Sequence, residues 1–588
     1  MMLPTLREYM EYQRPRFLRR PFWRLAAHFA ARVFENSADD SGEDELDLGV
    51  GSLLALLAVP GAFITILLFD KYSSLIRFFR GGPPFDPYAA SLPDQYFFIV
   101  FSMAITGVVT VIKWESIFPD RRDYMNLAPL PVTTRSIFLA NLIAVLAMAV
   151  LFAVDVNAVS SVLFPVIVNM ENGTFHQFLQ FAAVHGLSVM LASLFVFFGM
   201  FALIGLLMAV LPRSIFRRVS LYVRVAVIIY MLALLATGSA VPRFLGGKIP
   251  PPGWVQSLPP VWFLGLSRSL TGRSGPEFLP FAALALRALG GVSVAALALY
   301  AVSYRRHFAL IPEAVERGRR ESLRAEWLSL RGLKRLFLRS PFQRAFYPFI
   351  LKTLVRSEKH SLFFGAFLGL GLVMTSQRIV SGVNQIAGSG GTVPSADLLS
   401  APLLLFYCVI FGLRFAFEVP ADLRANWIHR MLVDCDKHES SAVARSVILS
   451  VVLPVVLFAC VPVYAYVWGW RVAGIHALIM GLACWFLTEL LLVKFRKIPF
   501  TCSYPHWSEY TIVNILLSVL GLVLFSSVPA QLELWMLGWT PGLLFLLPMI
   551  FVARKMLARL REQNAYRSRL VFEDQPIPAL ELLNLSGN

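Results

Sequence analysis

Long apolar runs, separated by short polar segments, dominate the chain. About twelve of these runs approach the roughly 20 apolar residues that a helix needs to cross the hydrocarbon of a bilayer. The run over 178–211 is long enough for a tilted or broken helix. The boundary between the ninth and tenth runs depends on residues 468–471, with the sequence Trp-Gly-Trp-Arg. The pattern predicts transmembrane helices over residues 49–69, 95–113, 136–156, 178–211, 221–242, 279–304, 361–377, 400–418, 443–468, 471–493, 510–529 and 535–553.

An amphipathic segment precedes the first of these runs. Over residues 20–33, apolar side chains recur at helical spacing on one face and basic side chains on another. A helix of this kind is suited to the headgroup layer of a membrane, where its arginines reach lipid phosphates. The acidic run over 39–47 that follows is expected to be a solvated loop. The apolar stripe consists of Phe22, Leu25, Phe29 and Val33, and the basic stripe of Arg20, Arg24, His28 and Arg32.

A short polar segment, residues 119–135, connects the second and third predicted spans and is called the first bridge below. Thr133 or Thr134 can cap the helix that follows it. The first bridge is either an amphipathic link resting on lipid or a helix that docks on a cytoplasmic partner. Its two aspartates favour docking, because an anionic inner leaflet would repel them. The candidate docking residues are Pro119, Asp120, Arg121, Arg122, Asp123, Tyr124, Leu127, Leu130 and Pro131.

The chain repeats itself at two places. Residues 17–24 (FLRRPFWR) return as 337–344 (FLRSPFQR), each time ahead of an apolar run. Residues 115–124 (ESIFPDRRDY) have a weaker counterpart in 418–427 (EVPADLRANW), at the start of a second bridge, residues 418–437. The matches occur in the same order at nearly the same separation, which predicts two parallel six-helix repeats, each preceded by a cytoplasmic amphipathic helix. The second-repeat counterparts of the first-bridge residues are Pro420, Asp422, Arg424 and Trp427.

These patterns predict an all-α polytopic membrane protein with five parts. The six-span units are connected by a cytoplasmic linker that ends in the second amphipathic helix. The parts are a cytoplasmic amphipathic helix and acidic loop (1–48), a first six-span unit (49–304), the linker (305–360), a second six-span unit (361–555) and a cytoplasmic tail (556–588).

Composition and charge agree with this class. The chain is 57% hydrophobic and only 15% charged, whereas soluble domains carry about 25% charged residues. Its formal net charge of +17 would suit a nucleic-acid partner, but the basic residues fall in alternate loops and not on one soluble domain, so none is expected. Most of the 53 Lys and Arg residues lie on the side predicted for both termini and the first bridge. Because positive loops stay inside, we expect that side to be cytoplasmic.

The sequence carries no enzyme signature. It has no GxxxxGK[ST] phosphate loop, no HExxH zinc pair and no GxSxG nucleophile turn. We therefore expect no catalytic residue, no metal and no directly bound cofactor. The five cysteines have no CxxC spacing and are interpreted as buried free thiols. His185 and His476 lie inside predicted spans and are interpreted as satisfied core residues.

Charged residues inside the apolar runs are further candidate sites, because an unpaired charge in hydrocarbon costs about 3 kcal/mol or more. Arg287 lies within the sixth run and is expected to face protein or water, as a substrate-pathway contact or as part of a structural pair. Arg414 is close enough to the end of its run to reach the interface. Glu489 and Asp155 are also expected near span ends.

At these residues the sequence resembles the membrane subunits of type-2 ABC exporters. In that family an amphipathic helix precedes the first span, a coupling helix between spans two and three docks on the ATP-binding subunit, and short helices re-enter the membrane before span six. Residues 20–33, 119–130 and 254–270 resemble these elements in turn. The 130–135 segment (LPVTTR), followed by Ile-Phe-Leu at 137–139, is similar to the family's entry to the third span. Asn141 stands where a second basic residue is often found.

The resemblance implies a permease subunit without catalysis of its own. ATP and Mg would be bound by separate ATP-binding cassette subunits, whose closure would push the coupling helices and rock the two six-span units around a central path. The second cytoplasmic loop, with Arg213, Arg217 and Arg218, would be a secondary contact. In the second half Asp422, Arg424 and Trp427 keep part of the pattern, but residues 431–437 replace the Leu-Pro entry, which implies a fused pair of units with a diverged second copy.

Two other classes of function remain open. The first is an ion- or proton-coupled secondary transporter, a class that usually needs acidic residues near the membrane midplane. Such residues are nearly absent from the predicted spans. The second is a membrane scaffold or lipid-handling protein without ATP. The apolar spans favour a lipid-like or amphipathic substrate and contact with membrane lipids, and the expected location is the cell (inner or plasma) membrane.

Overall fold

The structure of the protein is a computed structural model. Every regular element in the part of the chain that it describes is a helix, which confirms the expected all-α class. The described residues are 21–35, 50–73, 86–114, 133–170, 174–238, 240–245, 252–272, 278–310, 340–389, 394–421, 428–429, 431, 439–493, 495, 497–501 and 511–565.

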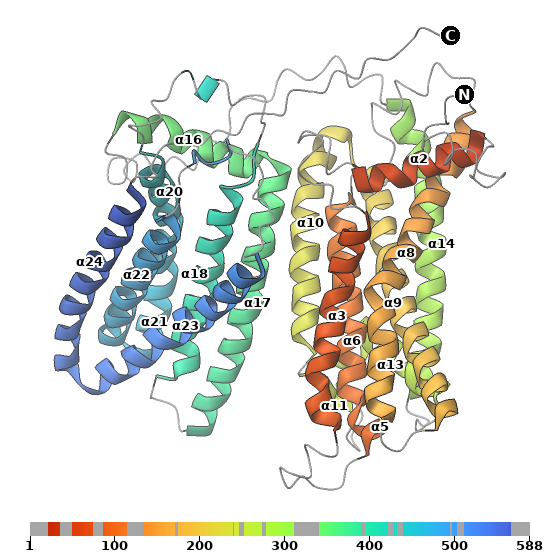
Figure 1. Cartoon of the computed structure of the whole chain (residues 1–588), viewed down its shortest axis with the longest axis horizontal. Helices are drawn as coiled ribbons and strands as arrows, with labels where there is room; N and C mark the ends of the chain where they lie inside the picture. Colours follow the sequence, from red (N-terminus) through yellow and green to blue (C-terminus); the bar gives the residue numbers. More distant parts are fainter. Residues whose placement is uncertain are drawn as a thin grey trace, which may run out of the picture. The chain divides into compact units, whose positions relative to one another are not determined.

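The chain separates into two compact units. The first contains the amphipathic helix α2 (Pro21–Glu35), a set of long helices, and short helices ahead of α6 and α14 (Figure 1). Its long helices are α3 (Val50–Tyr72), α6 (Leu92–Ile112), α8 (Thr134–Asn169), α9 (Phe175–Val210), α10 (Arg213–Ala236) and α14 (Leu279–Leu310). Its short helices are α5 (Pro87–Ala90), α11 (Pro242–Leu245), α12 (Gly253–Gln256) and α13 (Pro259–Leu270).

The second unit also starts with an amphipathic helix, α16 (Pro341–Arg356). The third of its long helices is continuous from α20 through a π-helical segment, η7, into α21. The elements that follow α16 are α17 (Glu358–Ser389), α18 (Ala396–Ala416), α20 (Ser440–Val455), η7 (Val456–Cys460), α21 (Val461–Trp468), α22 (Trp470–Leu492), α23 (Thr511–Gly538), the 3-10 helix η8 (Thr540–Phe545) and α24 (Leu546–Ala565).

Within the described ranges, ten helices are long and apolar enough to cross a membrane, so the chain is a multi-pass membrane protein. Helices α3 and α24, at the first and last expected spans, are not among the ten. From its middle onward, α24 carries Arg554, Lys555 and Arg559, which lowers its hydropathy. In α3, the side chains of the first half are outside the description.

Several span boundaries differ from those expected. Helix α8 continues to Asn169 and not to 156, and α9 runs unbroken over 36 residues. The predicted loop at 530–534 is wrong, because α23 continues through Pro529 to Gly538. An interior proline is tolerated in a membrane helix when neighbouring groups satisfy the freed backbone carbonyl. Two further prolines, Pro454 and Pro462, flank the π-helical turn η7, which lets α20 continue into α21.

The first unit is organised around α9, which packs against α6, α8, α13 and α14. Helix α6 also contacts α10, and α8 contacts α3. Large side chains fill the space between these helices, among them the fully buried Tyr96, Phe98, Phe164 and Phe263. The expected short helices at 254–270 are present as α12 and α13, and α13 packs inside the unit because its apolar face meets α6, α9 and α14.

The second unit is organised around α18, which packs against α17, α22 and α23. Helix α20 contacts both α16 and α22, and α24 lies against α22. The core of this unit includes Phe406, Ile410, Ile448 and Met480, all nearly inaccessible to solvent. In Figure 1, α23 is steeply tilted relative to α18 and α22.

The helix boundary expected at 468–471 is confirmed, because α21 ends at Trp468 and α22 begins at Trp470. Gly469 separates α21 from α22 with φ 85° and ψ 164°, a backbone conformation that is essentially restricted to glycine. The first long helix of the pair can therefore end and the second begin without an intervening loop.

The Gly469→Ala substitution tests this backbone requirement. A Cβ added at Gly469 would meet no atom within 4 Å, so the cost comes from the backbone and not from a clash. We expect a loss of about 1–3 kcal/mol in the free energy of unfolding, measured by reversible denaturation in mixed micelles. Gly474→Ala is the matched control, because its Cβ also meets nothing but its backbone is helical. Equal stability of the two variants would contradict the prediction.

Candidate functional site

The two amphipathic helices lie across one end of the long helices of their own units (Figure 1). In α2, Ala26 and Phe29 pack against Ile137 and Ala140 of α8, whereas Arg24 and His28 are exposed. The expected division into an apolar and a basic face is therefore present in the described part of the segment. The apolar face is covered by the start of α8, so α2 is attached to the helix that follows the first bridge.

In the second unit, α16 is attached to the start of α20 by hydrogen bonds. Ser340 Oγ and Gln343 Nε2 donate to Glu439 Oε2 at 2.6 and 3.0 Å. One turn and a half further along α16, Tyr347 OH donates to Ser450 Oγ at 3.0 Å. Both amphipathic helices thus contact the beginning of the third long helix of their unit.

The expected docking residues of the first bridge, from Pro119 to Pro131, lie outside the described residues. The structure does describe where the bridge ends. Thr133 caps α8, because its side chain accepts a hydrogen bond from the backbone N–H of Ser136. This confirms one of the two expected capping residues. Arg213, Arg217 and Arg218 lie in the first turns of α10, but their side chains are outside the description.

The second bridge is described at its start and at residues 428–429. Pro420 is buried, and its neighbour Ala421 donates a backbone hydrogen bond to Phe500 O at 2.9 Å. The ring of His429 packs against Phe346 and Phe349 of α16, with centroid separations of 5.9 and 5.8 Å. Burial lowers the pKa of His429, which favours the neutral ring at pH 7. Asp422, Arg424 and Trp427 lie outside the described residues.

The charged residues expected near span ends have different environments. Arg414 does not only reach the interface: it forms an ion pair with Glu418 at 2.7 Å and donates to Leu491 O. Arg287 lies on the exposed side of α14. The expectation that Asp155 lies near a span end is wrong. Helix α8 extends to Asn169, so Asp155 lies near the middle of a 36-residue helix.

The two histidines inside the spans differ from each other. His185 is fully buried among Phe98, Phe164 and Phe181, and within the described structure neither ring nitrogen has a hydrogen-bond partner, so the expectation that it is satisfied is not met. His476 has a partner at one ring nitrogen: its Nδ1 lies 2.8 Å from Glu533 Oε2, whereas its Nε2 has none among the described residues, so the expectation is met in part.

The His476–Glu533 pair joins α22 to α23 and is almost inaccessible, at 1% and 0% exposure. The ring of Tyr464 lies over the imidazole at 4.3 Å. Sequence reasoning missed Glu533 because it assigned residues 530–534 to a loop. The signal that could have found it is the apolar pattern, which continues from 529 to 538 around that single acidic residue.

Each unit has an ion pair that joins its first two long helices. In the first unit Lys71 Nζ lies 2.6 Å from Asp94 Oδ2, which also accepts from Tyr72 OH. In the second, Arg378 Nη1 lies 2.7 Å from Asp397 Oδ1. Sequence reasoning counted these basic residues only as loop charges. The sequence did contain a signal for these pairs. In both units an aspartate in the first turn of the second span follows a basic residue in the later part of the first span.

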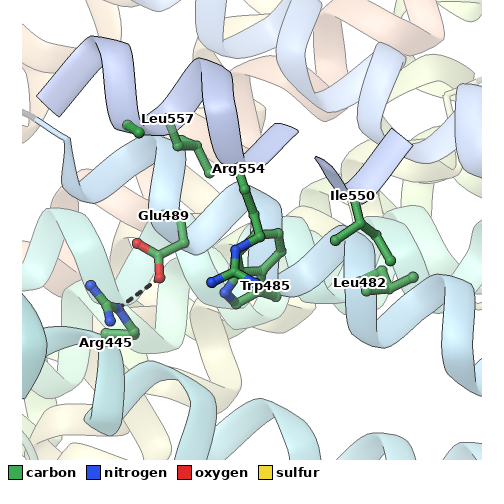
Figure 2. Close-up of a pocket in the computed structure, with 8 residues that line it drawn as sticks. Arg445, Leu482, Trp485, Glu489, Ile550, Arg554 and Leu557 are labelled. Carbon is green, nitrogen blue, oxygen red and sulfur yellow. Dashed lines mark ion pairs between the residues drawn. The ribbon is translucent and has the colours of Figure 1, made fainter. Parts of the chain in front are cut away.

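A polar cavity of about 560 Å³ lies between α20, α22 and α24 of the second unit (Figure 2). Arg445 and Glu489 form an ion pair on one side of it, with Nε and Oε1 2.8 Å apart. Arg554 of α24 and Trp485 of α22 also line it. Glu489 is near the end of α22, as expected, but it is buried and ion-paired. The cavity groups charges that are more than 100 residues apart in the sequence.

The described residues contain no group of three or more His, Cys, Asp or Glu side chains that could hold a metal ion. Cys408 and Cys484 are buried free thiols, and Cys460 is a half-buried one. The chemistry offered by the described residues is therefore the binding of charged groups at helix ends and one buried acid–base pair.

The buried pair gives a stability prediction. His476→Leu leaves the Glu533 carboxyl without its partner, and we expect a loss of about 3–5 kcal/mol in the free energy of unfolding in mixed micelles. The double variant His476→Leu/Glu533→Leu removes both polar groups and should recover most of this loss, because an apolar replacement of a buried pair is often neutral. A double variant as unstable as the sum of the single variants would show that the two residues act independently.

Comparison with known proteins identifies no relative of this chain. The chain matches no family model, no curated protein and no solved structure. The interpretation below therefore rests on the residues of this chain and on the resemblance of its motifs.

Proposed function

We propose that this chain is the transmembrane subunit of an ATP-driven ABC exporter, built as two parallel six-helix repeats. In this proposal it forms the translocation path and couples to separate ATP-binding subunits, which hold ATP and Mg. The chain would reside in the cell membrane with both termini in the cytoplasm.

One observation carries the proposal: in both units, an amphipathic helix packs on the start of the helix that follows the bridge. Helix α2 contacts α8, and α16 contacts α20. In the second unit the bridge also returns to the amphipathic helix, through His429 against Phe346. A force applied to a bridge would therefore be transmitted to the amphipathic helix and to the third long helix together.

The two-repeat layout is supported by matching contacts. The pairs α6–α9, α6–α10, α8–α9 and α9–α14 correspond to α18–α22, α18–α23, α20–α22 and α22–α24. The Lys71–Asp94 and Arg378–Asp397 ion pairs also correspond. The repeats are not identical, because α3 packs against α8 whereas its counterpart α17 packs chiefly against α18.

In the proposed mechanism, the first bridge supplies the contact with the ATP-binding subunit. Asp120, Arg121, Arg122 and Asp123 would form its polar contacts, and Tyr124, Leu127 and Leu130 its apolar anchor. Closure of the ATP-binding subunits would push the bridges and rock the two units between inward- and outward-open states. Arg213, Arg217 and Arg218 would make the secondary contact.

An ion-coupled transporter is the second candidate function, and the buried acid–base pair favours it. Asp155 lies in the middle of α8, and Glu533 is buried against His476. Among the described residues, the other carboxylate oxygen of Glu533 and the other ring nitrogen of His476 have no hydrogen-bond partner. Buried acidic residues of this kind mark proton and ion pathways in membrane proteins.

Co-purification tests the coupling proposal. We expect the tagged full-length protein, gently extracted from its native membrane, to retain a subunit that carries a GxxxxGK[ST] phosphate loop and hydrolyses ATP. Asp123→Ala/Tyr124→Ala should abolish this association while the thermal stability of the chain stays unchanged. The measurements are mass spectrometry of the purified complex, its ATPase activity, and the unfolding midpoint.

The matched control is Arg559→Ala/Glu562→Ala, which alters two exposed residues of α24 on the same predicted side of the membrane. It should retain the ATP-binding subunit. Collapse of expression in the Asp123→Ala/Tyr124→Ala variant would indicate a structural role for the bridge. If the wild-type protein retains no such subunit, the coupling proposal fails, and transport sensitive to an ionophore and to Glu533→Gln would support the second candidate.

A further inference from the structure

An apolar groove of about 680 Å³ adjoins the polar cavity of the second unit. Its walls come from α18, α22, α23 and α24, and most of its lining side chains are aliphatic or aromatic. Leu482, Trp485 and Ile550 line both spaces, so the polar cavity and the apolar groove are continuous. Each volume lies in the range of roughly 300–1,000 Å³ that is typical of ligand pockets.

The charged part of this combined space lies at the end of the unit that carries α16. Arg445 lies on α20 between Glu439 and Ser450, which accept hydrogen bonds from Ser340 and Tyr347 at the N-cap and in the second turn of α16. Glu489 is near the end of α22, and Arg554, close to the middle of α24, lines the same cavity. Helix α16 buries Tyr347 and Ile350 and exposes Arg344 and Lys352, as expected of a helix in the headgroup layer, and the charges of the cavity then lie at the depth of the headgroups.

The apolar groove runs alongside the charges and continues toward the middle of the helices. On α22 its lining runs from Leu491, two residues beyond Glu489, back to Ile479, which corresponds to roughly 18 Å of helix. Three of its lining residues on α23 are more than half exposed: Leu517 at 58%, Leu524 at 51% and Val528 at 56%. In the second unit the groove is therefore open at the surface of the transmembrane region.

The polar cavity has an excess of positive charge. Arg445 is neutralised by Glu489 at 2.8 Å. Arg554 is exposed and, in the part of the chain that the structure describes, forms no ion pair. Figure 2 shows the Arg554 side chain reaching from α24 toward the space beside Trp485. A ligand that fits here carries a negative group beside Arg554 and an apolar chain in the groove.

We propose that the combined cavity and groove bind an anionic phospholipid of the cytoplasmic leaflet, with its phosphate beside Arg554 and an acyl chain along α22 and α23. The charge complementarity at Arg554, the order of polar and apolar lining, and the opening toward the bilayer all favour this occupant. The site lies entirely within the second unit, so it does not depend on the ATP-coupled function proposed above.

Quenching of Trp485 fluorescence tests the site, because this side chain lines both the cavity and the groove. The full-length protein is placed in phosphatidylcholine vesicles containing either dibrominated phosphatidylglycerol or dibrominated phosphatidylcholine. The difference between wild type and Trp485→Phe isolates the signal of this tryptophan. We expect stronger quenching by the brominated phosphatidylglycerol at equal mole fraction, saturating with its concentration.

Arg554→Gln should raise the mole fraction of phosphatidylglycerol needed for half-maximal quenching about fivefold, the effect of one basic residue near an anionic surface. Arg559→Gln is the matched control on the same helix and should leave that fraction unchanged. Ala553→Phe narrows the groove without changing the charge and should also reduce the quenching. The unfolding midpoint of each variant verifies that it is folded.

Three results would overturn the proposal. Equal quenching by the two brominated lipids would indicate unspecific boundary lipid. If Arg554→Gln and Arg559→Gln reach half-maximal quenching at the same mole fraction of phosphatidylglycerol, Arg554 is not the headgroup contact. If neither brominated lipid quenches Trp485, protein and not lipid covers the groove.

Discussion

The cost of an unsatisfied polar group in hydrocarbon constrains every part of this protein. A bilayer offers no water to hydrogen-bond with backbone N–H and C=O groups, so a chain that crosses it repeatedly does so as helices. The described structure follows this constraint throughout, with long helices connected at their ends. Even the interior prolines of α20 and α23 are accommodated within helical backbone.

The same constraint explains where the polar contacts lie. Among the described residues, most ion pairs of the long helices include a side chain from the first or last turn of a helix, where water or headgroups are within reach: Lys71–Asp94, Arg378–Asp397, Arg414–Glu418 and Arg445–Glu489. The middle of the helices is joined by apolar packing and, in the first unit, by neutral hydrogen bonds from Ser102, Thr106 and Asn157 to Ser193. The His476–Glu533 pair is an exception because it is fully buried, and its two members are joined to each other by the contact of 2.8 Å between Nδ1 and Oε2.

The ends of the helices therefore carry the features that distinguish this chain from a plain helical bundle. At the end marked by α2 and α16, each amphipathic helix is attached to the third long helix of its unit, which favours a role in coupling. In the second unit the same end also holds the polar cavity, whose charges continue into an apolar groove.

The sequence by itself determined the fold class, the positions of most helices, both amphipathic helices and the break at Gly469. These follow from local properties: the length of apolar runs, helical periodicity, and the conformational freedom of one glycine. Helix ends were harder to predict, because an apolar run shows where a helix can lie in lipid but not how far it extends beyond it, as α8 and α23 illustrate.

Only the tertiary structure decided which distant side chains meet. The predicted span boundaries place Glu533 in a loop, whereas in the structure α23 continues past Pro529 and includes it. Its partner His476 lies 57 residues earlier in the chain. Arg445, Glu489 and Arg554 have no common sequence motif; the packing of α20, α22 and α24 brings them to one cavity. Pairing across helices depends on their rotation and depth, which the periodicity of a single helix does not encode.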